Sequence, residues 1–359
     1  MINMADNLPD REAAQQPLLD RLLETIKLTG QDTAQGIAAR RSQLMNMLKK
    51  RGEEKGSCYS SYLYVFPQST ESLSATGVEC NLDCAHCGGH YLQHMTPVKQ
   101  LVERLEEQQG RDLSTKSWLI SGGCDVMAGV HLPSQDILQL LSRRGYLNFH
   151  VGLARPEHLQ KASEFADSVC IDMIGSNETI RQVMGLDHSV EDYFQVFDEL
   201  RETLQVPVIP HIVVGLHGGK LRGEFRLLEE LSCREVEAVE FLILRPTPNT
   251  EFAQVSPPDL DDVAEVFITG RDLLPEAELG LGCMRPSGRY REAVDLLAAA
   301  CDFDVLVQPT SSVRSVIGEF QDQVEVWWGD QCCALYLNQL IEPLGQFDDI
   351  HAFRKHISE

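Results

Sequence analysis

Short apolar runs alternate with amphipathic segments over most of the chain. The strand-like runs are residues 60–66, the run into residue 76, and residues 117–121, 148–153, 168–174, 208–214, 240–244, 278–283 and 304–308. Apolar residues recur at helical spacing in residues 97–108, 136–144, 157–164, 189–204, 221–231, 260–273 and 288–300. Strands that alternate with helices predict a parallel sheet, and this many repeats favours a closed (β/α) TIM-type barrel over an open doubly wound sheet.

Two further segments flank the predicted barrel. Leucine and isoleucine recur at helical spacing in residues 18–26, and a second such segment covers residues 33–48. After the barrel, residues 323–328 and 334–337 are predicted as strands. The chain is therefore expected to be α/β, with a helical extension at residues 1–57, a barrel at 58–310 and a short β-rich and partly helical extension at 311–359.

The composition is that of an acidic globular protein. Its 359 residues are 43% hydrophobic and 24% charged, and 31 lysines and arginines against 54 aspartates and glutamates give a net charge of −23. A nucleic-acid backbone would be repelled by such a surface. No run of about 18 apolar residues predicts a membrane span, and the polar N-terminus lacks the basic and apolar stretches of an export signal. We therefore expect a cytoplasmic protein without nucleic-acid or membrane partners.

Cysteine is the most informative residue type in this composition. The eleven cysteines are Cys58, Cys80, Cys84, Cys87, Cys124, Cys170, Cys233, Cys283, Cys301, Cys332 and Cys333. An odd number in a chain without an export signal argues for a reducing compartment, where thiols are free, catalytic or bound to metal. A disulfide scaffold is therefore not expected.

Three of these cysteines form a motif with chemical meaning. Cys80, Cys84 and Cys87 follow the first barrel strand with C-x3-C-x2-C spacing on a loop that ends in two glycines. Three thiolates on a tight loop can hold three irons of a [4Fe–4S] cluster and leave the fourth iron open for a ligand. The alternative is a zinc site, for which His86 or His90 would supply the fourth ligand.

The motif resembles the signature of the radical S-adenosylmethionine (SAM) superfamily, which has the same cysteine spacing after the first barrel strand. The residue before the third cysteine is usually aromatic in that family and is His86 here. At the end of the second strand, Gly122 and Gly123 match the glycine pair that holds the amino group of SAM in the family. The family often continues with glutamate, whereas this chain has Cys124.

The resemblance implies a reaction and its cofactors. A reduced [4Fe–4S] cluster on the three cysteines would cleave SAM to methionine and a 5′-deoxyadenosyl radical, which abstracts a hydrogen atom from an unactivated carbon. It also implies an electron donor such as a ferredoxin or a flavodoxin.

Strand alternation adds two candidate residues inside the barrel. Cys170 and Asp172 share one face of their strand, because side chains repeat every two residues. In the biotin-synthase branch of the family an acid here contacts the SAM ribose, and the alternative is a buried structural carboxylate. Cys283 and Arg285 share a face in the same way, and an arginine inside a barrel requires a carboxylate, a phosphate or a cluster. Asp172 and Arg285 are therefore predicted to bind cofactor.

Several stretches narrow the resemblance to the biotin-synthase-related branch. They are the helical extension, residues 242–250 and residues 282–286. Within that branch, residues 84–95 and the pair Cys332-Cys333 are most similar to the two-component lipoyl synthases. These insert sulfur into an octanoyl chain on a lipoyl carrier protein, with the work divided between two sister radical SAM proteins.

Sulfur insertion implies a second iron–sulfur cluster, which is consumed as the sulfur source. One ligand set is Cys58, Cys301 and one of Cys332 and Cys333, since neighbours on a predicted strand face opposite ways. The other is a barrel site of Cys124, Cys170 and Cys283 with Arg285. The sequence leaves both sets open.

Two other functions stay open at this point. One is a radical SAM enzyme of the same branch that rearranges or cleaves a small molecule, or matures a cofactor, without sulfur insertion. The other is a zinc-binding module without catalytic activity, in which Cys80, Cys84, Cys87 and His90 hold one ion.

Overall fold

A computed structural model describes residues 11–28, 60–107, 115–155, 163–337 and 339–358, together with residues 46 and 159. All strands belong to one 11-stranded sheet in the order β11-β1-β10-β9-β8-β7-β6-β5-β4-β2-β3. The strands are β1 (Ser60–Val65), β2 (Thr70–Ser74), β3 (Thr96–Pro97), β4 (Ser117–Ser121), β5 (Tyr146–His150), β6 (Ser168–Met173), β7 (Val208–Val214), β8 (Ala238–Ile243), β9 (Glu278–Leu281), β10 (Val305–Val307) and β11 (Val324–Gly329). Every neighbouring pair is parallel.

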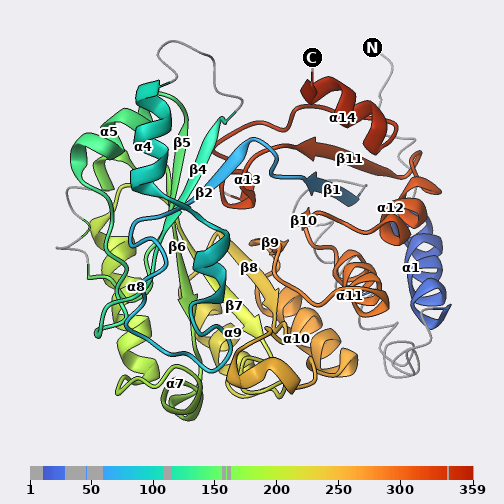
Figure 1. The fold of residues 1–359 in the computed structure, drawn as a ribbon. Helices are drawn as coiled ribbons and strands as arrows, with labels where there is room; N and C mark the ends of the chain where they lie inside the picture. Colours follow the sequence, from blue (N-terminus) through green and yellow to red (C-terminus); the bar gives the residue numbers. More distant parts are fainter. Residues whose placement is uncertain are drawn as a thin grey trace.

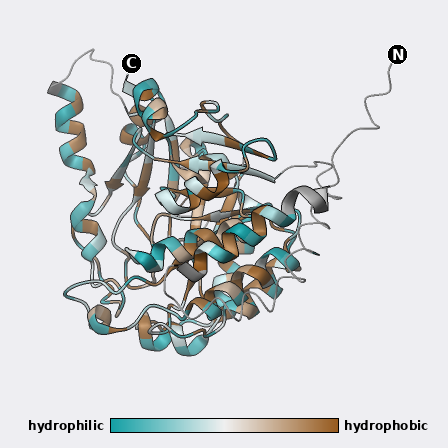
Figure 2. Cartoon of the chain, turned by 90° about the vertical axis from the view of Figure 1, so that its right-hand side faces the viewer, coloured by the Kyte–Doolittle hydropathy of each residue, from teal (hydrophilic) through white to brown (hydrophobic). Residues whose placement is uncertain are grey.

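Helices follow the strands and cover the outside of the sheet (Figure 1). They are α1 (Arg11–Leu28), η2 (His90–His94), α4 (Val98–Glu107), α5 (Gln135–Ser142), η3 (Ser163–Phe165), α7 (Asn177–Val183), α8 (Val190–Thr203), α9 (Glu224–Ser232), η4 (Glu251–Gln254), α10 (Leu260–Leu273), α11 (Arg289–Ala300), α12 (Ser311–Gly318), α13 (Cys333–Leu337) and α14 (Ile350–Ser358). Figure 2 shows that the helices carry both hydrophilic and hydrophobic positions, as expected for helices packed on a sheet. The predicted α/β barrel-like fold is confirmed.

The sheet curls into a barrel whose two ends do not pair with each other, so the expectation of a closed barrel is wrong. Among the described residues, β11 and β3 are the edge strands, and β1 instead of β2 lies beside β10. Residues that follow β11 cross the gap between the two ends of the sheet. The Asp330 carboxylate accepts hydrogen bonds from Ser69 Oγ and Lys116 Nζ, both at 2.7 Å. Because Asp330 follows the end of β11 and Ser69 and Lys116 precede β2 and β4, this contact ties the end of β11 to the starts of the strands across the gap.

Helix α13 closes one end of the barrel, and this corrects the prediction of a strand at residues 334–337. Its apolar side chains pack inside the barrel against residues of β1, β6, β7, β8 and β10. In Figure 1 α13 lies at the end where β6 and β7 begin, and their arrowheads point away from it. The run is buried on all sides, so it has no polar face whose spacing could distinguish a short helix from a strand.

The N-terminal extension is helical where the structure describes it. Helix α1 packs on the outside of α11 and α12, and Arg21 forms an ion pair of 2.8 Å with Glu319. The second predicted helix, apart from residue 46, and Cys58 lie outside the described residues. Within the described residues, no helix combines the length and the apolarity that a membrane crossing needs.

Candidate active site

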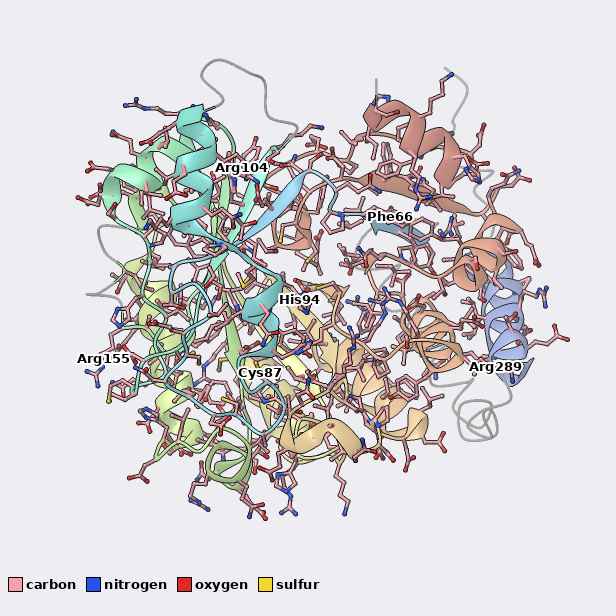
Figure 3. All side chains as sticks on the ribbon, viewed as in Figure 1. Phe66, Cys87, His94, Arg104, Arg155 and Arg289 are labelled. Carbon is pink, nitrogen blue, oxygen red and sulfur yellow. The ribbon has the colours of Figure 1, made fainter. Side chains whose placement is uncertain are left out.

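The three motif cysteines lie on the loop after β2, at the end of the barrel opposite α13. Figure 3 places Cys87 at this end, where the strands finish. The loop is held from two sides: the amide of Ala85 donates to Val183 O of α7, and the amide of Phe252 in η4 donates to Ala85 O. The carboxyl ends of barrel strands are where catalytic loops gather. The sequence prediction for the position of this loop is therefore confirmed.

The spacing of the motif thiols favours a cluster over a single zinc ion. One zinc ion holds each thiolate at about 2.3 Å, so two sulfurs on it lie about 3.8 Å apart. Among the described residues, only His150, Asp172 and His211 form a group of three possible metal ligands with all ligand atoms within 4.8 Å of one another. The sulfurs of Cys80, Cys84 and Cys87 are therefore spread more widely than one zinc ion requires.

Burial sets the electrostatics of the motif. Burial, together with the charges of Cys87 and Cys80, raises the pKa of Cys84 to about 12. The pKa of Cys87 is also raised by burial, although backbone amides of the following turn oppose the shift. Thiolates in this loop need a positive partner, and bound iron is such a partner.

Gly123 packs directly against the start of the motif. A Cβ on this residue would overlap the carbonyl oxygen of Glu79 and would lie 2.6 Å from the Cα of Cys80. Its amide donates to Thr76 Oγ1 at 2.7 Å. Gly122 is less confined, because a Cβ there would lie 3.2 Å from Thr76 Oγ1. The glycine pair thus lets the loop after β4 approach the cysteine loop, and its contact with SAM stays a prediction.

We expect Gly123→Ala to displace the loop that carries Cys80. The new methyl group meets backbone atoms, which cannot rotate away, so the variant should lose about 1–3 kcal/mol of stability. Its iron content after reconstitution should fall well below that of the wild type. Gly122→Ala is the matched control, because its neighbours are mostly side-chain atoms of Thr76. Equal iron contents in the wild type and Gly123→Ala would contradict the assigned close contact.

Below the motif loop, four polar side chains line the barrel interior and form a polar band. They are His150, Asp172, His211 and Glu240. In the strand register Asp172 lies beside His211, and His211 lies beside Glu240. His150 of β5 reaches the same level, with its Nε2 atom 3.5 Å from Asp172 Oδ1. His211 has its Nδ1 atom 3.8 Å from Asp172 Oδ1 and its Nε2 atom 3.7 Å from Glu240 Oε2.

The histidines determine the charge state of Asp172. Burial alone would raise its pKa, but His150, His211 and His86 together hold that pKa well below the usual value. In return Asp172 raises the pKa of His150, although burial opposes this. Burial lowers the pKa of His86, whose Nδ1 atom is buried without a hydrogen-bond partner. His86 of the cysteine motif thus couples electrostatically to the band.

A second group of thiols lies at the floor of the barrel. Cys332 Sγ accepts a hydrogen bond from Asn148 Nδ2 at 3.4 Å, and Cys170 Sγ donates to Asn148 Oδ1 at 3.3 Å. Cys333 Sγ donates to the Glu240 carboxylate at 3.0 Å. The hydrogen bond between the two adjacent thiols lowers the pKa of Cys332 and raises that of Cys333. Both side chains enter the barrel, so the expectation that they face opposite ways is wrong. The pair does not lie in a strand, because α13 begins at Cys333.

The structure does not bring together all members of either ligand set that was predicted for a second cluster. Cys283 is exposed beyond the carboxyl end of β9, at the mouth end of the barrel, so it does not lie with Cys332 and Cys333 at the floor. Cys124 belongs to the motif instead, since the charges of Cys80 and Cys84 add to the effect of burial on its pKa. Cys301 is buried at the end of α11, outside the barrel interior.

Arg285 is engaged in the barrel wall. Its guanidinium forms a fully buried ion pair of 2.7 Å with Asp295 of α11 and donates to the carbonyl oxygens of Gly282 and Val307. The predicted need for a carboxylate partner is met by Asp295. A role of Arg285 in cofactor binding stays a prediction.

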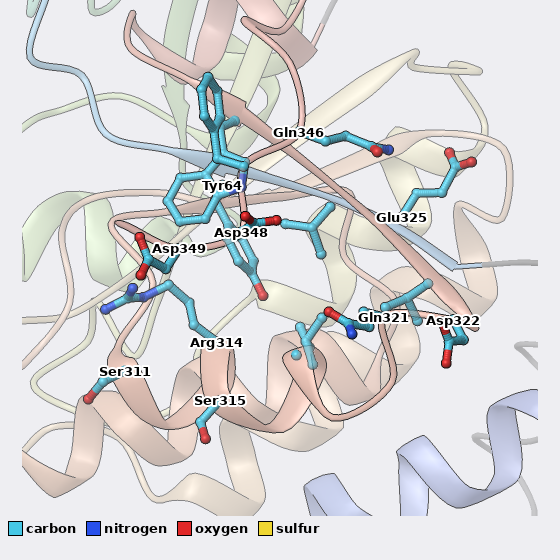
Figure 4. A pocket seen from close by; sticks show the side chains of 16 residues that line it. Tyr64, Ser311, Arg314, Ser315, Gln321, Asp322, Glu325, Gln346, Asp348 and Asp349 are labelled. Carbon is cyan, nitrogen blue, oxygen red and sulfur yellow. The ribbon is translucent and has the colours of Figure 1, made fainter. Parts of the chain in front are cut away.

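Sequence reasoning missed His150, His211 and Glu240. Each is a polar residue in an apolar strand, the same signal that selected Asp172, and the rule could have been applied to every strand. The missing information was which strands become neighbours and at which register. A pocket of about 900 Å³ between α12 and β11 contains none of the predicted site residues (Figure 4).

Comparison with known proteins identifies a shared fold. No protein-family model and no curated protein matches the sequence. Among solved structures, the chain is similar to HydG, a maturase of the [FeFe]-hydrogenase, with a TM-score of 0.56 and 12% identity over 99% of this chain and 84% of that chain. HydG from Carboxydothermus hydrogenoformans aligns with the same TM-score and identity over 96% and 86% of the two chains. At this identity the similarity shows that the fold is shared.

Proposed function

We propose that this chain is a radical SAM enzyme that holds a [4Fe–4S] cluster on Cys80, Cys84 and Cys87. The observation that carries the proposal is the position of three free thiols on one loop, at the mouth of a barrel with a polar interior. The fold that the chain shares with HydG supports it. When bound, the reduced cluster supplies the electron that splits SAM into methionine and a 5′-deoxyadenosyl radical.

The residues of the chain would position SAM and exclude water. Gly122 and Gly123 let the loop after β4 approach the cysteine loop, so their backbone groups would lie close to the amino acid part of SAM bound at the cluster. Asp172 is ionised and faces the barrel interior, so it can accept hydrogen bonds from a ribose hydroxyl pair. Helix α13 closes the opposite end of the barrel, which limits the access of water to a reactive radical.

Our finer proposal is sulfur insertion into an octanoyl chain on a lipoyl carrier protein, with a ferredoxin or flavodoxin as electron donor and a sister radical SAM protein as partner. The floor thiols support it, because Cys170 and Cys332 both contact Asn148 and Cys333 is the neighbour of Cys332. Such a group of thiols is able to ligate a second iron–sulfur cluster.

A second candidate is radical chemistry on a small molecule without sulfur insertion. The polar band favours it, because His150, Asp172, His211 and Glu240 would meet an octanoyl chain with charged groups. A small polar substrate would find hydrogen-bond partners there instead.

Iron counting tests the proposal and separates its two forms. After anaerobic reconstitution with iron and sulfide, we expect a brown protein with about four irons per chain if there is one [4Fe–4S] cluster, and six to eight if there is a second cluster. The Cys80/Cys84/Cys87→Ala variant should lose about four irons. Retention of iron and sulfide in that variant supports sulfur insertion, and complete loss supports the small-molecule reaction. A colourless wild-type protein that binds zinc in place of iron would contradict the whole proposal.

A further inference from the structure

We infer that His150, Asp172 and His211 form a binding site for one first-row divalent metal ion, Fe²⁺ or Zn²⁺, separate from the cysteine motif. Each residue offers one atom that can bind a metal, and these three atoms all lie within 4.8 Å of one another. In the described part of the chain, no other three histidine, cysteine, aspartate or glutamate residues meet this condition. Two imidazoles and one carboxylate are a common donor set for both metals. The site goes beyond the proposed radical SAM chemistry. It uses Asp172 Oδ1, so Asp172 Oδ2 stays available as the acceptor proposed for the SAM ribose.

The distances fit a single ion. Metal–nitrogen and metal–oxygen bonds of about 2.0–2.2 Å place neighbouring ligand atoms about 3–3.5 Å apart. His150 Nε2 lies 3.5 Å and His211 Nδ1 lies 3.8 Å from the same oxygen, Asp172 Oδ1. The two imidazole rings are stacked with centroids 5.2 Å apart, so the two histidines lie side by side next to this oxygen. A small rotation of the His211 ring closes the set around an ion.

One assigned ligand atom, His150 Nε2, lacks a hydrogen-bond partner within the protein, and so does the other ring nitrogen of His211. His150 Nε2 and His211 Nε2 are inaccessible to solvent, and neither makes a hydrogen bond. The separation of 3.5 Å between His150 and Asp172 is an ion-pair distance, longer than an N–H···O hydrogen bond. Leaving buried polar atoms unpaired costs free energy, and a bound ion removes that cost for His150 directly.

Glu240 supplies the outer support that metal-binding histidines usually have. If His211 binds through Nδ1, its Nε2 atom points to Glu240 Oε2 at 3.7 Å. A carboxylate that accepts the remaining imidazole proton orients the ring and strengthens the ligand. Gly282 makes room for this carboxylate, because a Cβ there would overlap Glu240 Oε1. Cys333 holds it from the other side with a hydrogen bond of 3.0 Å.

The position of the site indicates its use. Three protein ligands leave coordination positions for water or for a substrate atom. Asp172 lies near the end of β6, and the motif loop packs on α7, the helix after that strand, so the ion would lie on the interior side of the loop at the barrel mouth. The metal would anchor an oxygen, nitrogen or sulfur atom of the substrate inside the barrel, below the motif.

Zinc counting on the full-length, cluster-loaded protein tests the site, because the cluster contains no zinc. At a series of buffered free Zn²⁺ concentrations we expect one zinc per chain in the wild type. His150→Gln, His211→Gln and Asp172→Asn should each weaken zinc binding by at least about 100-fold, and Glu240→Gln by about 10–100-fold. His217→Gln is the control, since this histidine contacts Thr179 outside the band and should bind zinc like the wild type. Competition with Fe²⁺ then decides between the two metals.

Other outcomes would overturn the inference. Unchanged zinc binding in His150→Gln and His211→Gln would place the ion elsewhere, and wild-type protein that binds neither zinc nor one Fe²⁺ beyond its cluster would exclude the site. X-ray absorption of the wild-type zinc complex needs no variant to fold: a shell of nitrogen and oxygen is expected, and sulfur at about 2.3 Å would contradict the assignment. Iron is counted in the same samples, so a missing cluster would contradict the proposed function without affecting the zinc result.

Discussion

Alanine at any one of Cys80, Cys84 and Cys87 should reduce the reductive cleavage of SAM by at least about 1000-fold, equivalent to about 4 kcal/mol of activation free energy. Each thiol is assigned to one iron, so a single loss leaves an incomplete cluster. The measurement is the formation of 5′-deoxyadenosine under anaerobic conditions with a chemical reductant. Iron content in the same samples shows whether the cluster is lost or only inactive.

Two other cysteines provide controls for this experiment. Cys233 is exposed at the end of α9, far from the motif in the sequence and on the outside of the barrel, and its alanine variant should keep full activity. Cys124 lies next to the motif thiols, and Cys124→Ala should retain about four irons because three thiols suffice. If Cys124→Ala loses its cluster as completely as Cys84→Ala, four thiols bind the metal and no iron is open to SAM.

Arg285→Met should destabilise the protein by about 3–5 kcal/mol, because it leaves the Asp295 carboxylate buried without its partner. Both side chains are completely buried, and Asp295 Oδ2 also accepts a hydrogen bond from the amide of Thr310 at 2.7 Å. The free energy of unfolding in urea measures the effect. Arg289→Met, an exposed arginine on the same helix as Asp295, should change stability little (Figure 3).

A double variant separates a structural role of Arg285 from cofactor binding. Arg285→Met with Asp295→Leu removes both buried charges and should recover most of the lost stability. If Arg285 only supports the wall, the double variant should bind SAM with nearly the affinity of the wild type. If stability returns but SAM binding does not, the sequence-based prediction that Arg285 contacts the cofactor is correct.

Most elements of the barrel are predictable from the sequence because local pattern decides them. Residues 117–121, 208–214 and 260–273 agree with β4, β7 and α10 at both ends. The motif is equally local, since its three thiols lie within one loop. Helix α13 differs from its predicted strand because its five residues are all buried, so no alternation of polar and apolar positions marks its period.

The sequence by itself determined the α/β alternation and the loop of Cys80, Cys84 and Cys87, because spacing along the chain carries both. Only the tertiary structure decided which distant residues meet. His150, Asp172, His211 and Glu240 come from four different strands. The register makes Asp172, His211 and Glu240 neighbours, and the side chain of His150, whose register partner is Cys170, reaches Asp172. Likewise the contact of Asp330 with Ser69 and Lys116 joins segments from three parts of the chain. Such neighbours depend on how strands pair and how the sheet curls, and no local pattern of residues encodes those two properties.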